Sequence, residues 1–455
     1  MALIIGIILL VTYIAFIVYA VRGGNLMLGL FVMAVLWTVL GIAGGVMDGF
    51  PKMPEGATGW TALNFVITSV FNDGPTGFGA TAVYIIFGSW FGRILLDTGI
   101  ARTIIRKAVE LGGDRPALTC VLLCAVTALI FTTSYGPGAV VAIGVIVFPI
   151  MLSLGIPNTL ATCAFCMSVG CGLYFNQSLL TQAAGTMVLA DGTKYLASAA
   201  DWSQWYRFAF PAFAIHFVSI ILMVVITLKM TKSKAAVHAW AAPADAGATG
   251  KDVNGWACLT PIIPVTLAIA FNISQIPAIV IAVVYALLTT RAAKGWNEVC
   301  DLIQKSFHDG VADVGLVLGF LMSVQMFVRA ASACKNLLSP IFAPIIPSNV
   351  FVLFLVFGLL GFLALYRGPL TIWGAGVATF TIVASVTNLP IAVLYPLFYI
   401  PCCTVNTNVC PTQSWNMWAI GYNKVPISDF MKTCVPYALV CAFILEILAY
   451  FMFAV

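Results

Sequence analysis

The sequence has 455 residues, of which 62% are hydrophobic and only 8% are charged, and its mean hydropathy is +1.05. No soluble domain of this size has such a composition, so the chain is predicted to be all-α and to cross a membrane many times. Its net charge of +5 is not gathered into a basic cluster, and no DNA-reading motif occurs. Nucleic acid is therefore not expected as a partner.

Thirteen cysteines and three histidines raise the question of a metal site. The densest cysteine groups are Cys163, Cys166 and Cys171, and Cys402, Cys403 and Cys410. Both groups lie inside apolar segments without a nearby histidine, and their spacing fits no zinc pattern. Cysteine behaves as a small hydrophobic residue in such surroundings, so no metal cofactor is expected from them.

Four apolar runs of spanning length are expected as continuous helices in the first half of the chain. They cover residues 1–21, 25–46, 80–96 and 205–229. The first run has no basic start and no small-residue cleavage site, which predicts a retained helix and not a signal peptide. An amphipathic stretch at 59–74 and a basic interfacial segment at 97–114 flank the third run.

Two further segments of this half contain helix breaks. Residues 115–154 form two short apolar arms around Thr133, Ser134, Tyr135, Gly136 and Pro137, where Gly-Pro interrupts a helix. Each arm is short for a span, so a re-entrant hairpin is predicted. Residues 158–190 begin as an apolar helix and then become rich in Gly, Asn and Gln, which predicts a helix that unwinds within the membrane.

The same order of elements returns after a Lys-, Ala- and Gly-rich linker at 231–255, which is expected on the cytoplasmic side. Helices are predicted at 257–271 and 276–288, an amphipathic stretch at 295–310, a helix at 316–328 and an interfacial segment at 329–347. A second hairpin at 348–386, a helix at 390–420 broken at 401–411, and a last span at 430–453 follow.

Matching residues in the two halves indicate an ancient duplication. The pairs are Trp60 and Trp296, Asp73 and Asp309, Gly136-Pro137 and Gly368-Pro369, and Thr181-Gln182 and Thr412-Gln413. The number of residues that separates the two members of a pair decreases slowly along the chain. Chance matches would give scattered separations instead. Each half, 1–230 and 256–455, holds five predicted spans and one hairpin. Because five is odd, the second half is expected to run inverted to the first, which makes ten spans.

The distribution of Lys and Arg predicts the orientation independently. Placing the turn at 22–24 in the cytoplasm puts most basic residues inside, including Arg102, Arg106, Lys107, Lys229 and Arg291. Only Lys52, Lys194, Arg329, Lys335 and Arg207 then fall outside. The expectation is a bacterial inner membrane protein with both termini outside. The first hairpin then enters from the cytoplasm, the second enters from outside, and the tips meet near the midplane.

The hairpin tips and unwound helices supply a predicted substrate site, because helix ends inside a membrane expose unpaired backbone groups. In the first half its residues are Ser134, Tyr135, Gly136, Pro137, Asn176, Gln177, Ser178, Thr181 and Gln182. In the second half they are Tyr366, Arg367, Gly368, Pro369, Thr371, Asn406, Asn408, Thr412 and Gln413. Arg367 is the most informative of them, because an intramembrane arginine is costly and its planar fork suits a carboxylate. The alternatives for Arg367 are pairing with backbone carbonyls or an interfacial position.

Coupling to an ion is expected, but the sequence leaves Na⁺ and H⁺ open. A Na⁺ site is possible near Thr133, Gly170, Cys171, Thr404 and Thr407, where hydroxyls and carbonyls gather. No acidic residue is placed in the predicted site, and Glu446 is expected to lie far from the tips. A proton relay through side-chain carboxylates is therefore disfavoured.

The order of hairpin, broken helix, linker, hairpin and broken helix resembles the ion transporter superfamily of secondary carriers. Residues 91–101 (FGRILLDTGIA) and 307–318 resemble the gluconate permease family, and 133–151 resembles the anaerobic C4-dicarboxylate carriers. The tips depart from these families, because Tyr135 and the Tyr366-Arg367 pair stand where small residues are common. The resemblance implies an elevator motion of hairpins and broken helices against a scaffold, which is often dimeric.

The leading prediction is a secondary active transporter, not an enzyme, that carries a small organic anion such as a sugar acid or dicarboxylate by ion-coupled symport or exchange. Its expected partners are that anion, the lipid bilayer and a second copy of the chain. The alternative is a cation/proton antiporter of the same superfamily, which would require intramembrane acids. A membrane-embedded enzyme is disfavoured because no His/Asp or Cys/His pair has plausible spacing.

Overall fold

The computed structural model describes residues 2–22, 24–45, 58–113, 115–189, 191–230, 253–292, 295–342 and 344–455. Within these ranges every named secondary-structure element is a helix. The one isolated β-bridge there joins Val188 to Lys194. Six helices are long and apolar enough to cross a membrane. The chain is therefore a multi-pass membrane protein with an all-helical fold, as its composition predicts. The predicted linker at 231–255 falls almost entirely outside the described residues.

The first half begins with two helices joined by a tight turn, α1 (Ala2–Val21) and α2 (Leu26–Ala43). Three helices follow in nearly one line, α3 (Gly59–Phe71), α4 (Asp73–Gly77) and α5 (Gly79–Asp97), and then the amphipathic α6 (Ile100–Gly112). The first hairpin consists of α7 (Pro116–Phe131) and α8 (Pro137–Ser153). Each arm opens on a proline, which lacks only a backbone N–H that the first turn leaves unpaired anyway.

The first broken helix consists of α9 (Asn158–Gly172) and α10 (Gln177–Thr186), which meet at a bend of 74°. The long helix α11 (Ala199–Met230) completes this half. Helices α7 and α8 lie within residues 115–154, and α9 and α10 lie within residues 158–190.

The second half repeats this order. It contains η2 (Gly255–Ile262), α12 (Ile263–Phe271), α13 (Gln275–Thr290), α14 (Trp296–Ala333) and α15 (Lys335–Phe342). The second hairpin is α16 (Val350–Leu359), η3 (Gly361–Arg367) and α17 (Gly376–Thr387). The second broken helix is α18 (Ile391–Pro401), η4 (Cys402–Asn406), α19 (Thr407–Val409) and α20 (Ser414–Tyr422). The chain ends in α21 (Ile427–Ala449) and η5 (Tyr450–Ala454).

One element differs from its prediction because the first copy contains a proline that the second copy lacks. Pro75 lies within α4, the short helix between α3 and α5, whereas no proline occurs between Trp296 and Ala333. The amphipathic stretch at 295–310 and the helix at 316–328 are therefore one continuous helix of 38 residues. The interfacial segment expected from residue 329 begins inside that helix.

The second broken helix also differs, because its break lies later than predicted. The sequence places the break at 401–411, but the helix continues past Pro401 through the π-helical turn η4 and ends at Val409. A π-helical turn accommodates the local loss of helical hydrogen bonding that a proline causes. Cys410 is extended, with φ −77° and ψ 122°, as expected for a residue that precedes a proline.

The return arm of the second hairpin, α17, begins only at Gly376, several residues after Gly368-Pro369, which lengthens the tip of this hairpin. By length and composition, six helices span, or eight if each bent pair counts as one span. The short helices α12 and α18 fall below that length. The count of ten spans stays a prediction.

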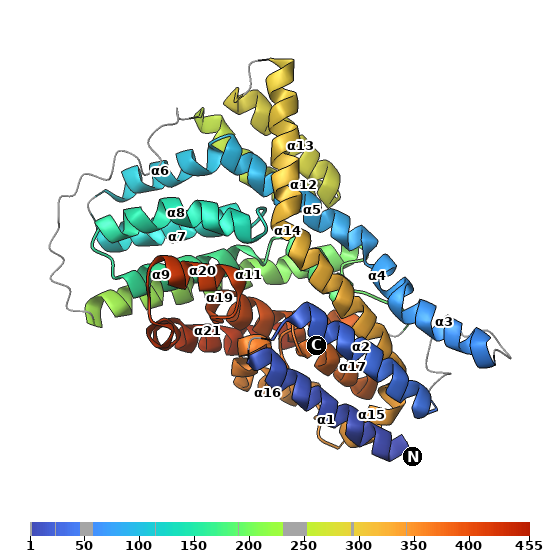
Figure 1. Cartoon of the computed structure of the whole chain (residues 1–455). Helices are drawn as coiled ribbons and strands as arrows, with labels where there is room; N and C mark the ends of the chain where they lie inside the picture. Colours follow the sequence, from blue (N-terminus) through green and yellow to red (C-terminus); the bar gives the residue numbers. More distant parts are fainter. Residues whose placement is uncertain are drawn as a thin grey trace.

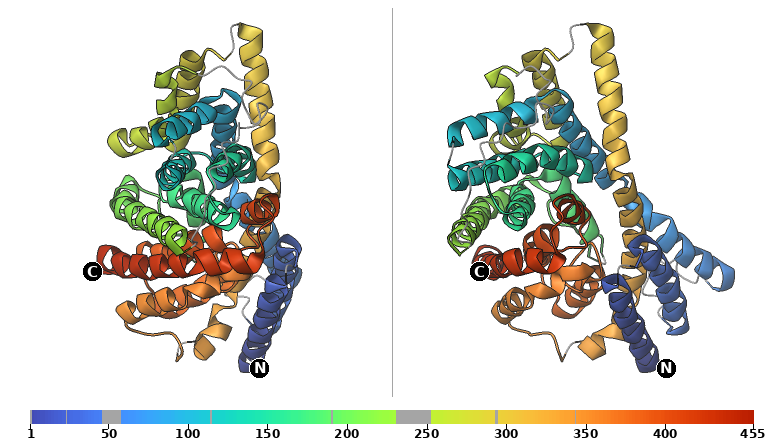
Figure 2. Two further views of the ribbon diagram at one scale, coloured as in Figure 1. Left: turned by 90° about the vertical axis from the view of Figure 1, so that its left-hand side faces the viewer. Right: turned by 60° about the vertical axis from the view of Figure 1, so that its left-hand side comes forward.

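The long helix α14 extends over much of the length of the molecule (Figure 1) and lies along one side of it (Figure 2). It packs against α2 near one end and against α5 along its middle, while α13 packs against α5. Figure 2 shows α1 and α2 beside one end of α14 and α12–α13 beside the other. Helix α2 of the first half thus packs on α14 of the second half, and α13 of the second half packs on α5 of the first half.

The two broken helices lie side by side and run antiparallel. Asn423 near the end of the second contacts Asn158 and Thr162 at the start of the first. Tyr399 and Tyr395, earlier in the second, donate hydrogen bonds of 2.9 Å to the carbonyls of Leu173 and Leu180. α11 and α21 are antiparallel too, since Phe208 contacts Phe453 and Ser219 bonds to Tyr437.

Candidate functional site

The tip of the first hairpin is held by a single asparagine of the adjacent broken helix. Asn176 Nδ2 donates to the carbonyls of Phe131 (2.9 Å) and Ser134 (2.8 Å). Its Oδ1 accepts from the backbone N–H of Leu179 (3.1 Å), which caps α10. At the tip, Gly136 has φ 107°, a conformation that favours glycine. Asn176 therefore satisfies backbone groups that the break leaves unpaired in both segments.

The tip of the second hairpin is longer and is held in the same way. Asn406 Nδ2 donates to the carbonyl of Ala364 (3.1 Å), and the Thr371 hydroxyl donates to the same carbonyl. Tyr366 and Arg367 have φ values of 54° and 61°, which non-glycine residues seldom adopt. The Arg367 carbonyl accepts from the N–H of Ala375 (3.0 Å). This strained pair of residues turns the Arg367 side chain toward the other half of the molecule.

A cavity of about 450 Å³ lies between the two tips and the two breaks. Its walls come from both hairpins (Tyr135, Pro137, Arg367, Trp373), both broken helices (Leu179, Gln182, Thr407, Thr412, Gln413, Ser414, Trp415, Met417), α14 (Leu316, Val317, Phe320), α1 (Ala20) and the start of α2 with the turn before it (Gly24, Asn25, Leu26, Met27). Two of the lining residues are linked, because the Tyr135 hydroxyl donates a hydrogen bond to Gln182 Oε1. Residues from the two halves thus enclose one space.

Arg367 borders this cavity with its guanidinium only loosely held. Nη1 lies 3.4 Å from the carbonyl of Trp373, and Nη2 lies 3.5 Å from the carbonyl of Thr412. Within the described ranges, no carboxylate forms an ion pair with Arg367. Arg367 therefore does pair with backbone carbonyls, which was one of the alternatives for this residue. However, two long hydrogen bonds to neutral acceptors leave the charge of its guanidinium uncompensated.

Six of the predicted site residues line the cavity, namely Tyr135, Pro137, Gln182, Arg367, Thr412 and Gln413. Others face away from it. Gln177 donates to the Tyr206 hydroxyl of α11 (2.9 Å), and Ser178 accepts from Gln275 Nε2 of α13 (2.6 Å). These two side chains therefore attach α10 to its neighbouring helices. The Tyr366 hydroxyl points to Met431 Sδ, 3.1 Å away.

The remaining predicted residues hold the frame of the site. Asn176, Asn406 and Thr371 fasten the hairpins as described, while Ser134, Gly136, Gly368 and Pro369 shape the tips, and Thr181 is half-buried on α10. A β-carbon on Gly368 would lie 2.2 Å from the carbonyl oxygen of Leu363, so only glycine fits there. Which of these residues contact a substrate stays a prediction.

Asn408 belongs to a buried network that joins the two broken helices. Its Nδ2 donates to His216 Nε2 (3.2 Å) and to the carbonyl of Thr404 (3.0 Å). His216 Nδ1 lies 3.2 Å from the hydroxyl of Tyr174 at the first break. Asn408 and His216 therefore connect the halves and do not reach the cavity.

The five residues considered for Na⁺ do not gather at one point. The hydroxyls of Thr133, Thr404 and Thr407 each donate to a carbonyl of their own helical segment. Gly170 and Thr404 approach one another around Asn408, whereas Thr407 borders the central cavity. Among the described residues, no group of three His, Cys, Asp or Glu side chains could hold a metal ion. A Na⁺ site stays a prediction.

One ion pair beside the first tip was missed by the sequence reasoning. Arg93 of α5 donates from Nε and Nη2 to the two carboxylate oxygens of Asp313 on α14, both at 2.6 Å. A β-carbon on Gly138 would lie 2.2 Å from Asp313 Oδ1, so the carboxylate packs against the first turn of α8. An acid thus lies next to the hairpin, although it is not among the residues that line the central cavity. The signal was present, since Arg93 and Asp313 are opposite charges inside apolar helices.

No family model and no curated protein matches the sequence. Two solved structures share its fold. The YdaH transporter of Alcanivorax borkumensis matches 94% of this chain and 99% of its own, with a TM-score of 0.62 and 15% identity. MtrF of Neisseria gonorrhoeae, described among antimetabolite efflux pumps, matches 92% of this chain and 94% of its own, with a TM-score of 0.53 and 15% identity.

Both proteins are membrane transporters, and neither is a gluconate permease or a C4-dicarboxylate carrier. The comparison thus supports the broad resemblance to transporters and not the narrower one. This chain is a multi-pass membrane protein with the fold of the YdaH and MtrF transporters.

Proposed function

We propose that the protein is a secondary active transporter of a small organic anion. The observation that carries this proposal is Arg367, a guanidinium without a described carboxylate partner in a cavity enclosed by both hairpin tips and both helix breaks. A guanidinium in such a place is costly unless an anion compensates it. The planar fork of arginine binds a carboxylate through two parallel hydrogen bonds.

The walls of the cavity favour an anion with an apolar or aromatic part. Trp373, Trp415, Phe320 and Leu316 border the space, and Tyr135 adds a ring with a polar end. A sugar acid would leave many hydroxyl groups facing these apolar surfaces without partners, which costs binding energy. An amphipathic carboxylate would place its charge at Arg367 and its apolar part against the aromatic wall.

Coupling to H⁺ is supported by the Arg93–Asp313 pair, because Asp313 is an intramembrane carboxylate in contact with a hairpin tip. Na⁺ remains the other ion. The antiparallel broken helices support an inverted repeat. An elevator motion of the hairpins and broken helices against a scaffold of α1, α2, α12 and α13 is part of the proposal. A homodimer through that scaffold, the bacterial inner membrane and external termini belong to the same proposal.

Asp313 also keeps the second candidate open, a cation/proton antiporter. That function requires an intramembrane acid near the moving parts, and Asp313 is one. The two functions differ in one measurable way, because an antiporter moves Na⁺ or H⁺ without any organic anion.

The test uses purified protein in liposomes with an imposed Na⁺ or H⁺ gradient. Benzoate, succinate and gluconate are the radiolabelled probes, and benzoate is expected to accumulate most. Arg367→Gln should lower its uptake at least about 30-fold, since an unpaired charge costs about 2–5 kcal/mol, while Arg367→Lys should keep part of it. Arg102→Gln, at an exposed arginine of α6, is the matched control and should not change uptake.

Each arm of this experiment has a defined reading. Uptake that Arg367→Gln leaves intact would remove Arg367 from the site. Ion flux of equal size with and without all three anions would favour the antiporter. Preference for gluconate over benzoate would contradict the aromatic wall as the selecting feature.

A further inference from the structure

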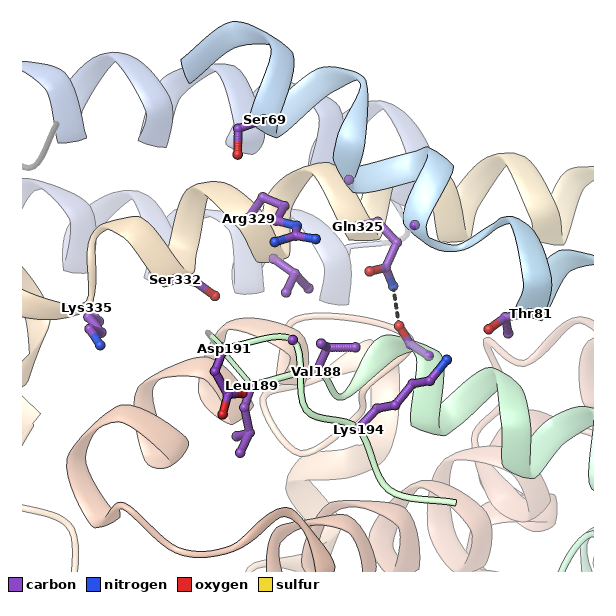
Figure 3. Close-up of a pocket in the computed structure, with 15 residues that line it drawn as sticks. Ser69, Thr81, Val188, Leu189, Asp191, Lys194, Gln325, Arg329, Ser332 and Lys335 are labelled. Carbon is purple, nitrogen blue, oxygen red and sulfur yellow. Dashed lines mark hydrogen bonds between the residues drawn. The ribbon is translucent and has the colours of Figure 1, made fainter. Parts of the chain in front are cut away.

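A second cavity lies outside the central one and carries an excess of positive charge. It has a volume of about 440 Å³ and is lined by parts of both halves. The residues are Ser69, Gly74, Gly77 and Thr81 from α3–α5, Gly185, Val188, Leu189, Asp191, Gly192 and Lys194 from the end of α10 and the loop after it, and Gln325, Val328, Arg329, Ser332 and Lys335 from α14 and α15. We call this space the basic cavity (Figure 3).

Three cations and one acid border the basic cavity, namely Lys194, Arg329, Lys335 and Asp191. Figure 3 shows Arg329 between the α14 ribbon and the loop that carries Asp191 and Lys194. Within the described ranges, none of the three cations forms an ion pair with a carboxylate. Asp191 Oδ1 instead accepts from the backbone N–H of Thr193 (2.9 Å), and this bond lowers the pKa of the Asp191 carboxyl. The cavity therefore keeps a net positive charge.

The basic cavity and the central cavity lie along the same seam between α10 and α14. On α10, Leu179 and Gln182 border the central cavity, and Gly185, about one turn further on, borders the basic cavity. On α14, Phe320 borders the first and Gln325 borders the second. Gln325 Nε2 donates to the carbonyl of Gly185 (2.8 Å), and this bond crosses the seam between the two spaces.

We propose that the basic cavity is an anion-binding antechamber that collects carboxylates at the mouth of the α10–α14 seam. A cleft with one sign of charge raises the local concentration of the opposite ion and speeds association by about 10- to 1000-fold at low salt. Arg329 and Lys335 are half-buried, so they hold the anion within the wall and not on an open surface. Binding here requires no transport, so the inference extends beyond the proposed function and can fail separately from it.

The basic residues of the cavity come from segments that are far apart in the sequence. Arg329 and Lys335 belong to the second half, whereas Lys194 belongs to the first. These three residues are among the few that the charge distribution places on the outer side of the membrane. Their clustering supports a mouth that opens on that side and takes an anion from there.

The test measures the charge of the cavity with a thiol and needs no knowledge of the substrate. Ser332→Cys introduces the thiol, and the full-length protein in detergent reacts with an anionic (sulfonatoethyl) or cationic (trimethylammonioethyl) methanethiosulfonate. The ratio of the two rates, normalised to 2-mercaptoethanol, cancels the reactivity of the thiolate itself. Labelling of the unsubstituted protein is subtracted, because Cys258 and Cys300 are partly exposed.

The anionic reagent should be favoured at least about tenfold at low salt and hardly at all in 1 M salt. The double substitution Arg329→Gln and Lys335→Gln should lower the ratio of anionic to cationic rates to about the value for 2-mercaptoethanol. Asp191→Asn should raise this ratio. Arg329→Lys keeps the charge and should keep the ratio, which separates charge from folding. Sulfate at millimolar concentration should slow the anionic reagent.

Three results would overturn the proposal. The first is a ratio equal to that of 2-mercaptoethanol in the Ser332→Cys protein. The second is a ratio that the double substitution leaves unchanged. The third is an equal fall of the ratio on Arg367→Gln, because the charge would then belong to the central cavity. Loss of benzoate uptake in Arg367→Gln with an intact ratio would confirm two separate sites.

Discussion

The two hairpins share one method of attachment and differ in what surrounds their tips. Asn176, directly after the break of the first broken helix, and Asn406, shortly before the break of the second, each donate from Nδ2 to carbonyls at the end of a hairpin arm. Around the first tip lies a compensated charge, Arg93 with Asp313, on the neighbouring helices. The second tip itself carries Arg367, which has no described carboxylate partner.

This difference indicates a division of labour within a duplicated unit. The attachment is common because every re-entrant hairpin must satisfy the backbone groups that its break exposes. Under the proposed function, the charges differ because Arg367 binds the substrate and Asp313 responds to the coupling ion. The first hairpin is thus suited to respond to H⁺ through Asp313, and the second is suited to hold an anion.

The largest effect on stability is expected at the ion pair beside the first tip. Arg93→Gln should lower the free energy of unfolding by about 3 kcal/mol, because it leaves the Asp313 carboxylate without its partner. Arg93→Gln combined with Asp313→Asn should recover most of that loss. Chemical unfolding in mixed micelles measures both. If the double variant loses the sum of what Arg93→Gln and Asp313→Asn lose separately, the two residues are not coupled.

The next effect compares the two attachments directly. Asn176→Ala should destabilise the protein by about 3 kcal/mol, since it leaves the carbonyls of Phe131 and Ser134 and the N–H of Leu179 without this partner. Asn406→Ala should cost only about 1 kcal/mol, because the Ala364 carbonyl keeps Thr371 as a donor. The same unfolding measurement applies. Equal losses would contradict the asymmetry of the attachments.

A third prediction concerns the outer arm of the second hairpin, where α16 packs on α21. Glu446 is fully buried there beside Gly358, and neither carboxyl oxygen has a described hydrogen-bond partner. Glu446→Met should therefore stabilise the protein by about 2 kcal/mol. Transport of benzoate should not change, because the residue does not border the central cavity. A loss of coupled uptake in a stable variant would instead make Glu446 part of the ion pathway.

The smallest effect is expected inside the cavity wall. Tyr135→Phe removes the hydroxyl that donates to Gln182 and should cost about 1 kcal/mol. The ring remains, so the aromatic contact with a substrate should persist. We expect a change of KM for benzoate of about fivefold or less with little change in maximal rate. A loss as large as that of Arg367→Gln would show that the hydroxyl contacts the substrate directly.

The sequence alone determined the order of the helices, both hairpins and both helix breaks. These features follow from local chemistry, since long apolar runs must be helical in a membrane and Gly-Pro pairs interrupt them. It also identified Arg367, because a charge at such a position is informative without any neighbour. One local error, a break that was predicted to begin at Pro401 within 401–411, arose because a π-helical turn absorbs the first proline.

Only the tertiary structure decided which polar residues share a space. Gln177, Ser178 and Gln182 lie on one short helix, yet only Gln182 faces the central cavity, because packing of α10 against α5 and α11 sets its rotation. The Arg93–Asp313 pair joins residues 220 positions apart. The three cations of the basic cavity likewise come from both halves. Contacts of this kind depend on how helices pack, which no local pattern of residues specifies.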